Sequence, residues 1–395
     1  MKAVCCELSK LSRHGVIAPR ADCRSSRSIT HGLFVKETHG MKILALDLGK
    51  FKTVACHYED GQHHFETLQT ETQIFRLTIE RAHADVVVFE TCTAAGWLAD
   101  LCEELEQPFF VANPSGEAWK WSSIKRKTDR DDALKLARLT AMNELPTVHV
   151  SSRAVRAKRS LLRTRQAIVS RRVKIQNEIR ALWQSQGFLP FKSGKTGWTK
   201  AQRGTLREQT LPLVECGDEE LWRGQLLLLL DGLEYAFAQE KILERKLEQM
   251  AKANRAVQRL LSIPGVGRCT AEVIAAYLDE PKRFRNGRKV SSYAGLVPRQ
   301  YQSGNSDRCG RITKRGSKML RRAVVECAWL LIRYNPWAKE LFDRLTGGQK
   351  TRRKQAAVAV GRRLLVRCWA MLRDDVNWNG PPKFAAEPTQ PATVM

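Results

Sequence analysis

A regular alternation of strand and helix patterns between residues 41 and 142 is the feature that most constrains the fold. Ile43–Leu48 and Asp85–Glu90 are almost continuously apolar, which is typical of parallel strands that are buried on both faces. The strand pattern at Thr53–Tyr58 follows the first strand after a short turn and predicts a hairpin. This order predicts an α/β fold with helices packed on a mixed sheet. The other expected elements are helices at 74–82, 93–106 and 129–142 and a strand at 109–112.

Two long helical patterns follow this region. Ser151–Gln186 is rich in Arg and Lys and contains no proline, and Glu219–Ala253 predicts a second long helical segment that is broken or bent near Gly232. Two long helices joined by a loop favour an antiparallel hairpin or a coiled coil. We therefore expect domains at 41–147, 148–255 (coiled coil and linker helices) and 256–374 (mainly α-helical), with a disordered leader or misassigned start at 1–40 and a disordered tail at 375–395.

The charge of the chain is strongly positive and unevenly distributed. Lys and Arg number 67 against 41 Asp and Glu, which gives a net charge of +26. Residues 41–112 carry a net −7, whereas residues 113–395 carry +29. A cationic excess of this size indicates a polyanionic partner, because it makes phosphate binding hard to avoid. The acidic first domain suits metal or acid–base chemistry, and the basic remainder suits nucleic acid.

The apolar and cysteine patterns argue against a membrane-spanning protein and against a structural zinc protein. No apolar run reaches the length of about 18 residues that a transmembrane helix needs. The 11 cysteines are scattered without a Cys-x-x-Cys pair, which argues against structural zinc and for free thiols in a reducing compartment. We therefore expect a cytoplasmic protein without membrane contact.

Four carboxylates from separate segments are candidate metal ligands. Asp47 and Glu90 end apolar strands, and Asp129 and Asp132 lie three residues apart at the start of a predicted helix, so that both can face one way. The α/β arrangement brings strand ends and a helix start to one rim. Carboxylates crowded together need cations between them, and hard oxygen ligands favour Mg²⁺ or Mn²⁺. Two such ions about 4 Å apart promote phosphoryl transfer.

A purely structural interpretation of the same carboxylates stays open. Aspartate after a strand is common in turns, Asp129 could be only a helix N-cap, and Asp132 could only interact with the helix dipole. Glu90 is harder to explain in this way, because it closes the apolar DVVVF run at the edge of a core.

The basic half of the chain contains a glycine turn between two helical patterns. Leu260–Leu278 predicts a helix, a Pro-Gly-Val-Gly turn and a second helix. Gly265 and Gly267 permit the tight turn, and the backbone N–H groups that follow suit a phosphate. This segment resembles a helix–hairpin–helix, a DNA-backbone binder that is indifferent to sequence; a plain helical connector is the alternative.

A hydroxyl-rich loop surrounded by cations follows in Ser291–Arg322. Ser303 stands beside Gly304, and a serine in this setting could attack phosphorus while the cations stabilise the developing charge. A turn residue is the ordinary alternative, and Tyr301 and Ser317 are nearly equal candidates. The candidate nucleic-acid contacts in this loop are Arg311, Lys314, Arg315 and Arg321, to which we add Lys125, Lys127 and the basic long helix from Arg153 to Arg172.

Several motifs in this order resemble those of one family. They are DLGK with Asp47, FET with Glu90, KTDRDDA with Asp129 and Asp132, IPGVG, and YAGLVPRQYQSG followed by GRITKRGS and LRR. Together they resemble the DEDD transposases of the insertion sequence 110 family from about Met41 to Arg373. The leader and the tail lie outside the resemblance.

The resemblance implies a fold, a mechanism and partners. The first domain would be a ribonuclease H-like fold of the RuvC type, with Asp47, Glu90, Asp129 and Asp132 as its metal tetrad and Mg²⁺ or Mn²⁺ as cofactor. The C-terminal domain would supply the nucleophile Ser303. Members of the family act on donor and target DNA, guided by a structured bridge RNA, through a covalent phosphoserine intermediate. They assemble as dimers that pair into tetramers, with composite sites.

Two other functions remain open at this point. A RuvC-type junction nuclease would use water as its nucleophile and leave no protein-linked DNA. A non-catalytic nucleic-acid-binding protein would bind without Mg²⁺ and would not depend on Asp47.

Overall fold

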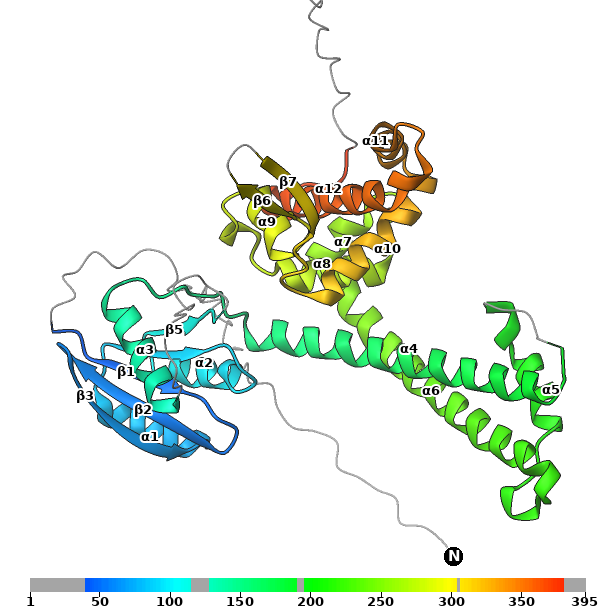
Figure 1. The fold of residues 1–395 in the computed structure, drawn as a ribbon, viewed down its shortest axis with the longest axis horizontal. Coiled ribbons are helices and arrows are strands. Elements are labelled where there is room, and N and C mark those ends of the chain that lie inside the picture. Colours follow the sequence, from blue (N-terminus) through cyan, green and yellow to red (C-terminus); the bar gives the residue numbers. More distant parts are fainter. Residues whose placement is uncertain (1–39, 115–127, 190–194, 304–305, 380–395) are drawn as a thin grey trace, which may run out of the picture. The chain divides into compact units, whose positions relative to one another are not determined.

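A computed structural model describes residues 40–114, 128–189, 195–303 and 306–379. The chain divides into two compact units, residues 1–150 and 151–395. Unit 1 is mixed α/β and unit 2 is mainly helical (Figure 1). In the described part of the chain, no helix combines the length and the apolar character needed to cross a membrane.

Unit 1 is built on a five-stranded mixed sheet with the order β3-β2-β1-β4-β5. The strand β1 pairs antiparallel with β2 and parallel with β4, while β2–β3 is antiparallel and β4–β5 parallel. The elements are β1 (Ile43–Asp47), β2 (Lys52–Glu59), β3 (Gln62–Gln69), α1 (Thr72–Ala82), β4 (Val86–Glu90), α2 (Ala95–Glu104), β5 (Phe109–Ala112) and α3 (Asp129–Ala141). The predicted α/β class and hairpin are confirmed, and β3 is an additional strand.

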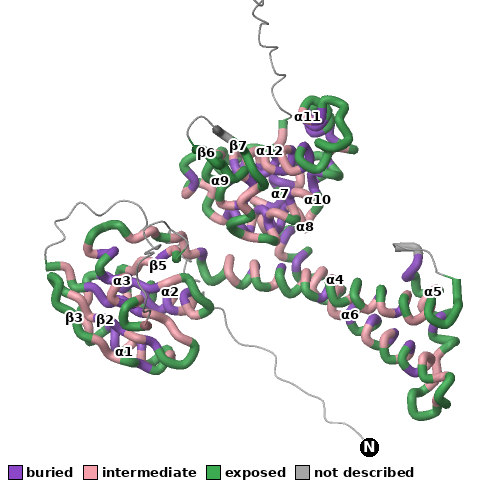
Figure 2. The backbone as a smooth tube through the Cα atoms, in the orientation of Figure 1, coloured by how far each residue is buried: buried purple, intermediate pink, exposed green. Residues whose placement is uncertain are grey.

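Helices cover both faces of this sheet. On one face, Leu44, Leu46 and Phe89 pack with side chains of α1 and α2. On the other face, Ile43 and Val88 pack with α3. The sequence predicts this arrangement because β1 and β4 are apolar at every position before their terminal carboxylates and need cover on both sides. Figure 2 shows the buried residues concentrated in these central strands.

An imidazole pair on β2 and β3 gives unit 1 a pH-sensitive element. The His57 and His64 rings are stacked with centroids 4.4 Å apart. Burial first, and then the neighbouring His64, lower the pKa of His57 below its ordinary value of 6.5. Protonation is therefore easier in the unfolded chain than in the folded one.

We expect unit 1 to lose stability as the pH falls below about 6.5 toward the folded-state pKa of His57. Thermal unfolding of the full chain at pH 7.5 and 5.5, compared with His57→Gln, measures this effect. The variant should show a smaller fall in the Tm of unit 1. An equal fall in both proteins would show that His57 does not contribute.

Unit 2 begins with two long antiparallel helices, α4 (Arg153–Ser185) and α6 (Leu221–Lys252). Ion pairs join them between Arg172 and Glu240, whose side-chain atoms lie 2.7 Å apart, and between Arg165 and Glu244. The helix α6 is continuous from Leu221 to Lys252, so the expected break near Gly232 is wrong. A Cβ at Gly232 would make only ordinary contact with Ile175. The short helix α5 (Lys200–Glu208) packs beside α6.

The rest of unit 2 is a helical body with one two-stranded sheet. A single hydrophobic core joins α8, α10 and α12. The elements are α7 (Arg255–Leu261), α8 (Arg268–Leu278), α9 (Gly287–Tyr293), β6 (Pro298–Ser303), β7 (Ser306–Ile312), α10 (Lys318–Tyr334), α11 (Pro336–Thr346) and α12 (Arg353–Asp374). The 3₁₀ turns of unit 2 are η2 (Lys195–Trp198), η3 (Leu213–Glu215), η4 (Asp218–Glu220), η5 (Pro281–Arg283) and η6 (Lys350–Arg352).

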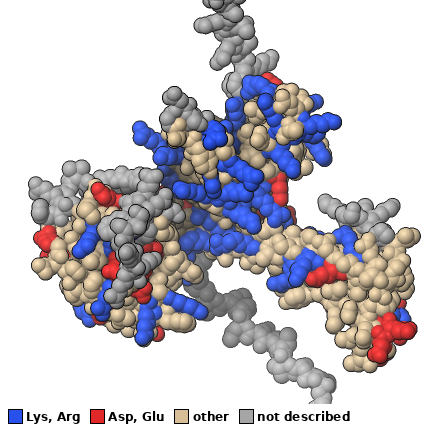
Figure 3. Space-filling model, in the orientation of Figure 1, with Lys and Arg blue, Asp and Glu red and all other residues tan. Residues whose placement is uncertain are grey.

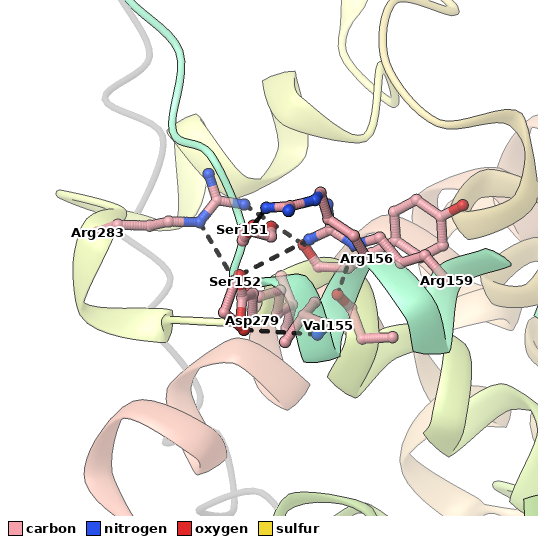
Figure 4. A network of polar contacts seen from close by, with 10 residues as sticks. Ser151, Ser152, Val155, Arg156, Arg159, Asp279 and Arg283 are labelled. Carbon is pink, nitrogen blue, oxygen red and sulfur yellow. Dashed lines mark hydrogen bonds and ion pairs between the residues drawn. The ribbon is translucent and has the colours of Figure 1, made fainter. Parts of the chain in front are cut away.

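A polar network fixes the start of α4 on the helical body (Figure 4). The hydroxyl of Ser152 accepts a hydrogen bond from the Val155 N–H and caps the helix. Arg159 donates to the Ala276 carbonyl at 2.8 Å, and its guanidinium lies 3.9 Å from the Asp279 carboxylate. Arg283 donates to the Tyr277 carbonyl from the other side. The Arg159 contacts at the C-terminal end of α8 join α4 to the body, and the Arg283 contact holds the end of α8 within the body.

Candidate functional site

Asp47 and Glu90 occupy equivalent positions on neighbouring parallel strands. Asp47 is the last residue of β1 and Glu90 the last of β4, and Leu46 and Phe89 are paired one step before them. Because side chains alternate along a strand, Asp47 shares a face with Ile43, and Glu90 shares it with Val88. That is the face that α3 covers. Both carboxylates are half-buried at the edge of the core.

The first turn of α3 carries Asp129 and Asp132. Their spacing places them on the side of α3 that carries the buried Ala133, which faces the sheet. Val54, the β2 partner of Asp47, lines a shallow hollow of about 660 Å³ together with Thr128–Asp131. Asp47 and Glu90 therefore lie on the face of the sheet that α3 covers, and Asp129 and Asp132 lie in the first turn of that helix.

The four carboxylates are of the chemical type that binds a divalent cation, although they do not enclose a site for one. Three aspartates and one glutamate supply the hard oxygen ligands that Mg²⁺ and Mn²⁺ prefer. Among the residues that the structure describes, no three His, Cys, Asp or Glu side chains lie close enough together to hold a metal ion. Asp47, Glu90 and Asp132 each make other interactions within the protein.

Asp131 has a structural role that separates it from its neighbours. Thr128 caps α3 by accepting from the Asp131 N–H, while the Asp131 carboxylate accepts from the N–H and hydroxyl of Thr128 at 3.1 and 2.7 Å. This reciprocal capping box makes Thr128 the N-cap. The alternative of Asp129 as the N-cap is therefore wrong, since Asp129 is the first residue inside the helix.

Ser303 lies on a β-hairpin, where the sequence suggested a loop. It is exposed at the end of β6, and its backbone pairs with Ser306 of β7. The alternation along β6 and β7 is obscured by many polar residues, which is why no strand was expected. Tyr301 is exposed on the same hairpin, whereas Ser317 caps α10 by accepting from the Leu320 N–H at 3.2 Å. Ser317 is thus accounted for structurally.

The glycine turn between α7 and α8 packs inward on one side. Gly265 has a φ of +93°, and a Cβ there would lie 3.2 Å from the Leu331 side chain of α10. Buried Asn335 donates to the Pro264 carbonyl at 3.2 Å. Gly267, the N-cap of α8, faces open space. Gly265 therefore has a structural reason to be glycine, and of the two only Gly267 leaves room for a ligand.

The predicted cationic contacts differ in their surroundings. Arg311, Lys314 and Arg315 are exposed. The Arg321 guanidinium instead donates to the backbone carbonyls of Ala294, Arg315 and Gly316, which gives it a structural role in holding a turn. Lys125 and Lys127 lie outside the described residues.

Sequence reasoning missed a group of arginines on α11 and α12. Burial first, and then the charges of Arg344, Arg362 and Arg367, lower the pKa of Arg363. Neighbouring positive charges raise the local potential, which attracts anions. Figure 3 shows Lys and Arg side chains gathered over this helical body. The RR pair at 362–363 was the available signal. We call Arg344, Arg362, Arg363 and Arg367 the arginine cluster.

Two family models of transposases match this chain. Residues 44–186 match a family model of IS110 DEDD transposases, described as "Transposase", and residues 257–343 match "Transposase IS116/IS110/IS902 family". Together the two matches span more than half of the chain.

Whole-chain relatives carry similar descriptions. The chain is 27% identical to the transposase for insertion sequence element IS1111A of Coxiella burnetii, over 86% of this chain and 93% of that protein. It is 28% identical to the transposase for insertion sequence element IS1328 of Yersinia enterocolitica, over 80% and 92%. Among solved structures, T. thermophilus RuvC in complex with a Holliday junction substrate matches at 12% identity and a TM-score of 0.22, over 27% of this chain and 99% of that one.

Proposed function

The chain belongs to the IS110 family of DEDD transposases, and from this premise we propose that it is a metal-dependent DNA recombinase with a serine nucleophile. The observation that carries the proposal is the placement of Asp47 and Glu90 at the ends of neighbouring parallel strands, on the face that is covered by α3 with Asp129 and Asp132 in its first turn. The strand order β3-β2-β1-β4-β5, with only β2 antiparallel to its two neighbours, supports a ribonuclease H-like assignment for this unit.

The four carboxylates would hold Mg²⁺ or Mn²⁺, which would supply positive charge to a DNA phosphate when bound. The exposed Ser303 hydroxyl would attack the phosphorus, forming a Ser–O–P bond as the bond to the 3′-oxygen breaks. The 3′-oxygen leaves with a proton. The 3′-hydroxyl of a second strand would then attack the same phosphorus, forming a new 3′-O–P bond as the Ser–O–P bond breaks and a proton returns to the Ser303 oxygen. The number of phosphoester bonds is conserved, so no external energy source is required.

The cationic residues of unit 2 would bind the nucleic-acid backbone. Arg311, Lys314 and Arg315 are exposed on or next to the hairpin that carries Ser303. Gly267 has no side chain and leaves the N-terminus of α8 accessible to a phosphate. Contacts of this kind position a duplex and carry no sequence information. We therefore assign the choice of donor and target DNA to base pairing with a structured bridge RNA. We also assign the protein to homodimers that combine into tetramers, in which the metal site of one subunit meets the Ser303 of another.

The test is incubation of the full chain with supercoiled DNA carrying the element ends and its flanking non-coding RNA, with Mg²⁺ or EDTA. We expect Mg²⁺-dependent strand exchange and a DNA–protein adduct that survives denaturing electrophoresis. Cleaved DNA without any adduct would support the junction nuclease instead. Binding that is unaffected by EDTA, without cleavage, would support a non-catalytic protein.

The arginine cluster leads to a separate prediction about DNA affinity. Arg362→Gln with Arg363→Gln should weaken binding to duplex DNA and reduce the slope of log K against log salt by about 1.8, since each phosphate contact contributes about 0.9. Fluorescence anisotropy over a range of salt concentrations measures this slope. Arg245→Gln with Lys246→Gln, two exposed cations on α6, is the matched control. Equal slopes for both double variants would show that the arginine cluster does not contact DNA phosphates.

A further inference from the structure

The turn between β1 and β2 presents an aromatic ring to solvent directly after a candidate metal ligand. It consists of Leu48–Phe51 and directly follows Asp47, the last residue of β1. The Phe51 side chain is 71% exposed. The Lys50 ammonium lies 4.8 Å from the centre of the Phe51 ring. A large apolar ring held in water is unfavourable for the isolated protein, so it suggests a binding partner.

The backbone of this turn is fixed by several contacts. Gly49 has no room for a side chain, because a Cβ there would lie 2.2 Å from the Lys52 carbonyl oxygen. Thr70 donates from its hydroxyl to the Gly49 carbonyl at 3.1 Å and from its N–H to the Phe51 carbonyl at 2.9 Å. Fully buried Thr53 shares a 2.9 Å hydrogen bond with the Thr70 hydroxyl. Phe51 is therefore displayed on a firmly held backbone.

Phe51 and Lys50 together are chemically complementary to an unpaired nucleotide. An exposed aromatic ring provides a stacking surface for a base of any identity, and a neighbouring ammonium can contact the phosphate of the same strand. Intact duplex DNA offers no free base face to such a ring. A protein partner would have to approach the Lys50 charge as well, which favours an anionic strand over an apolar peptide.

We propose that Phe51 stacks on an unpaired DNA base beside the phosphate that is cleaved, while Lys50 contacts the backbone of that strand. This inference rests on the proposed function for its choice of DNA as the partner. It assigns a strand-holding site to the turn that follows Asp47, formed by two residues outside the carboxylate set.

The test compares the affinity of the full chain for two probes: a duplex with a central unpaired bubble containing 2-aminopurine, and the same duplex fully paired. Phe51→Ala should weaken bubble binding by about 5- to 150-fold, the range for loss of one stacked base, and abolish the fluorescence quenching that stacking causes. Phe51→Trp should retain both. Affinity for the paired duplex should be unchanged in every variant.

Leu77→Ala is the matched control, because Leu77 is a similarly exposed apolar residue of unit 1 on α1, at 54%. Equal bubble affinity and quenching in wild type and Phe51→Ala, with unchanged circular dichroism, would overturn the stacking site. Strand cleavage is scored separately. Loss of quenching in Phe51→Ala together with no cleavage by the wild type would refute the proposed recombinase function. The same result would support the proposed base-stacking site.

Discussion

Replacing Asp47 by asparagine is expected to reduce the rate of DNA strand cleavage by about 10³-fold or more. The substitution keeps the size of the side chain and removes one anionic oxygen from the carboxylate face. Metal-derived charge stabilisation of phosphoryl transfer amounts to several kcal/mol, and each 1.4 kcal/mol corresponds to about a factor of ten in rate. Single-turnover cleavage of labelled DNA in saturating Mg²⁺ measures the loss.

Asp131→Asn is the matched control for this prediction. It changes a carboxylate in the same helical turn, but one that belongs to the capping box with Thr128. We expect a loss of about 1 kcal/mol in the free energy of unfolding and nearly unchanged cleavage. Equal losses of activity in both variants would show that the carboxylates of α3 and β1 act through stability alone.

Replacing Ser303 by alanine should abolish the covalent DNA–protein adduct while leaving DNA affinity nearly unchanged. Only the attacking oxygen is removed, and Ser303 is exposed at the end of β6, so the fold of the hairpin should persist. Denaturing electrophoresis with end-labelled DNA detects the adduct, and anisotropy gives the affinity.

Ser306→Ala, at the paired position of the same hairpin, should form the adduct as the wild type does. If Ser303→Ala still formed the adduct, the nucleophile would lie elsewhere, and Tyr301, exposed on the same strand, would be the next residue to replace.

Much of unit 1 could be predicted from the sequence, because its central strands carry an unambiguous pattern. In β1 and β4 every residue before the terminal carboxylate is apolar, a pattern that is typical of strands covered on both faces. The strand β3 has the sequence QHHFETLQ and is mostly exposed at the sheet edge. An edge strand with one partner does not need alternating apolar residues, so it leaves a weak signal.

The candidate site was predictable to the level of segments and less so to the level of contacts. Asp47 and Glu90 follow from strand ends, which are fixed by local patterns. The inward packing of Gly265 and the carbonyl contacts of Arg321 depend on α10 and on a turn distant in the sequence. Tertiary packing of this kind has no local sequence signature, and the arginine cluster likewise becomes visible only when α11 and α12 are placed together.

The most direct measurement of the central claim is Mn²⁺ binding to the full chain, followed by electron paramagnetic resonance of the free ion. The wild type should remove Mn²⁺ from solution, Asp47→Asn and Glu90→Gln should each bind it much more weakly, and Asp131→Asn should bind it as the wild type does. Equal Mn²⁺ binding by all four proteins would contradict a shared cation site on this face of unit 1.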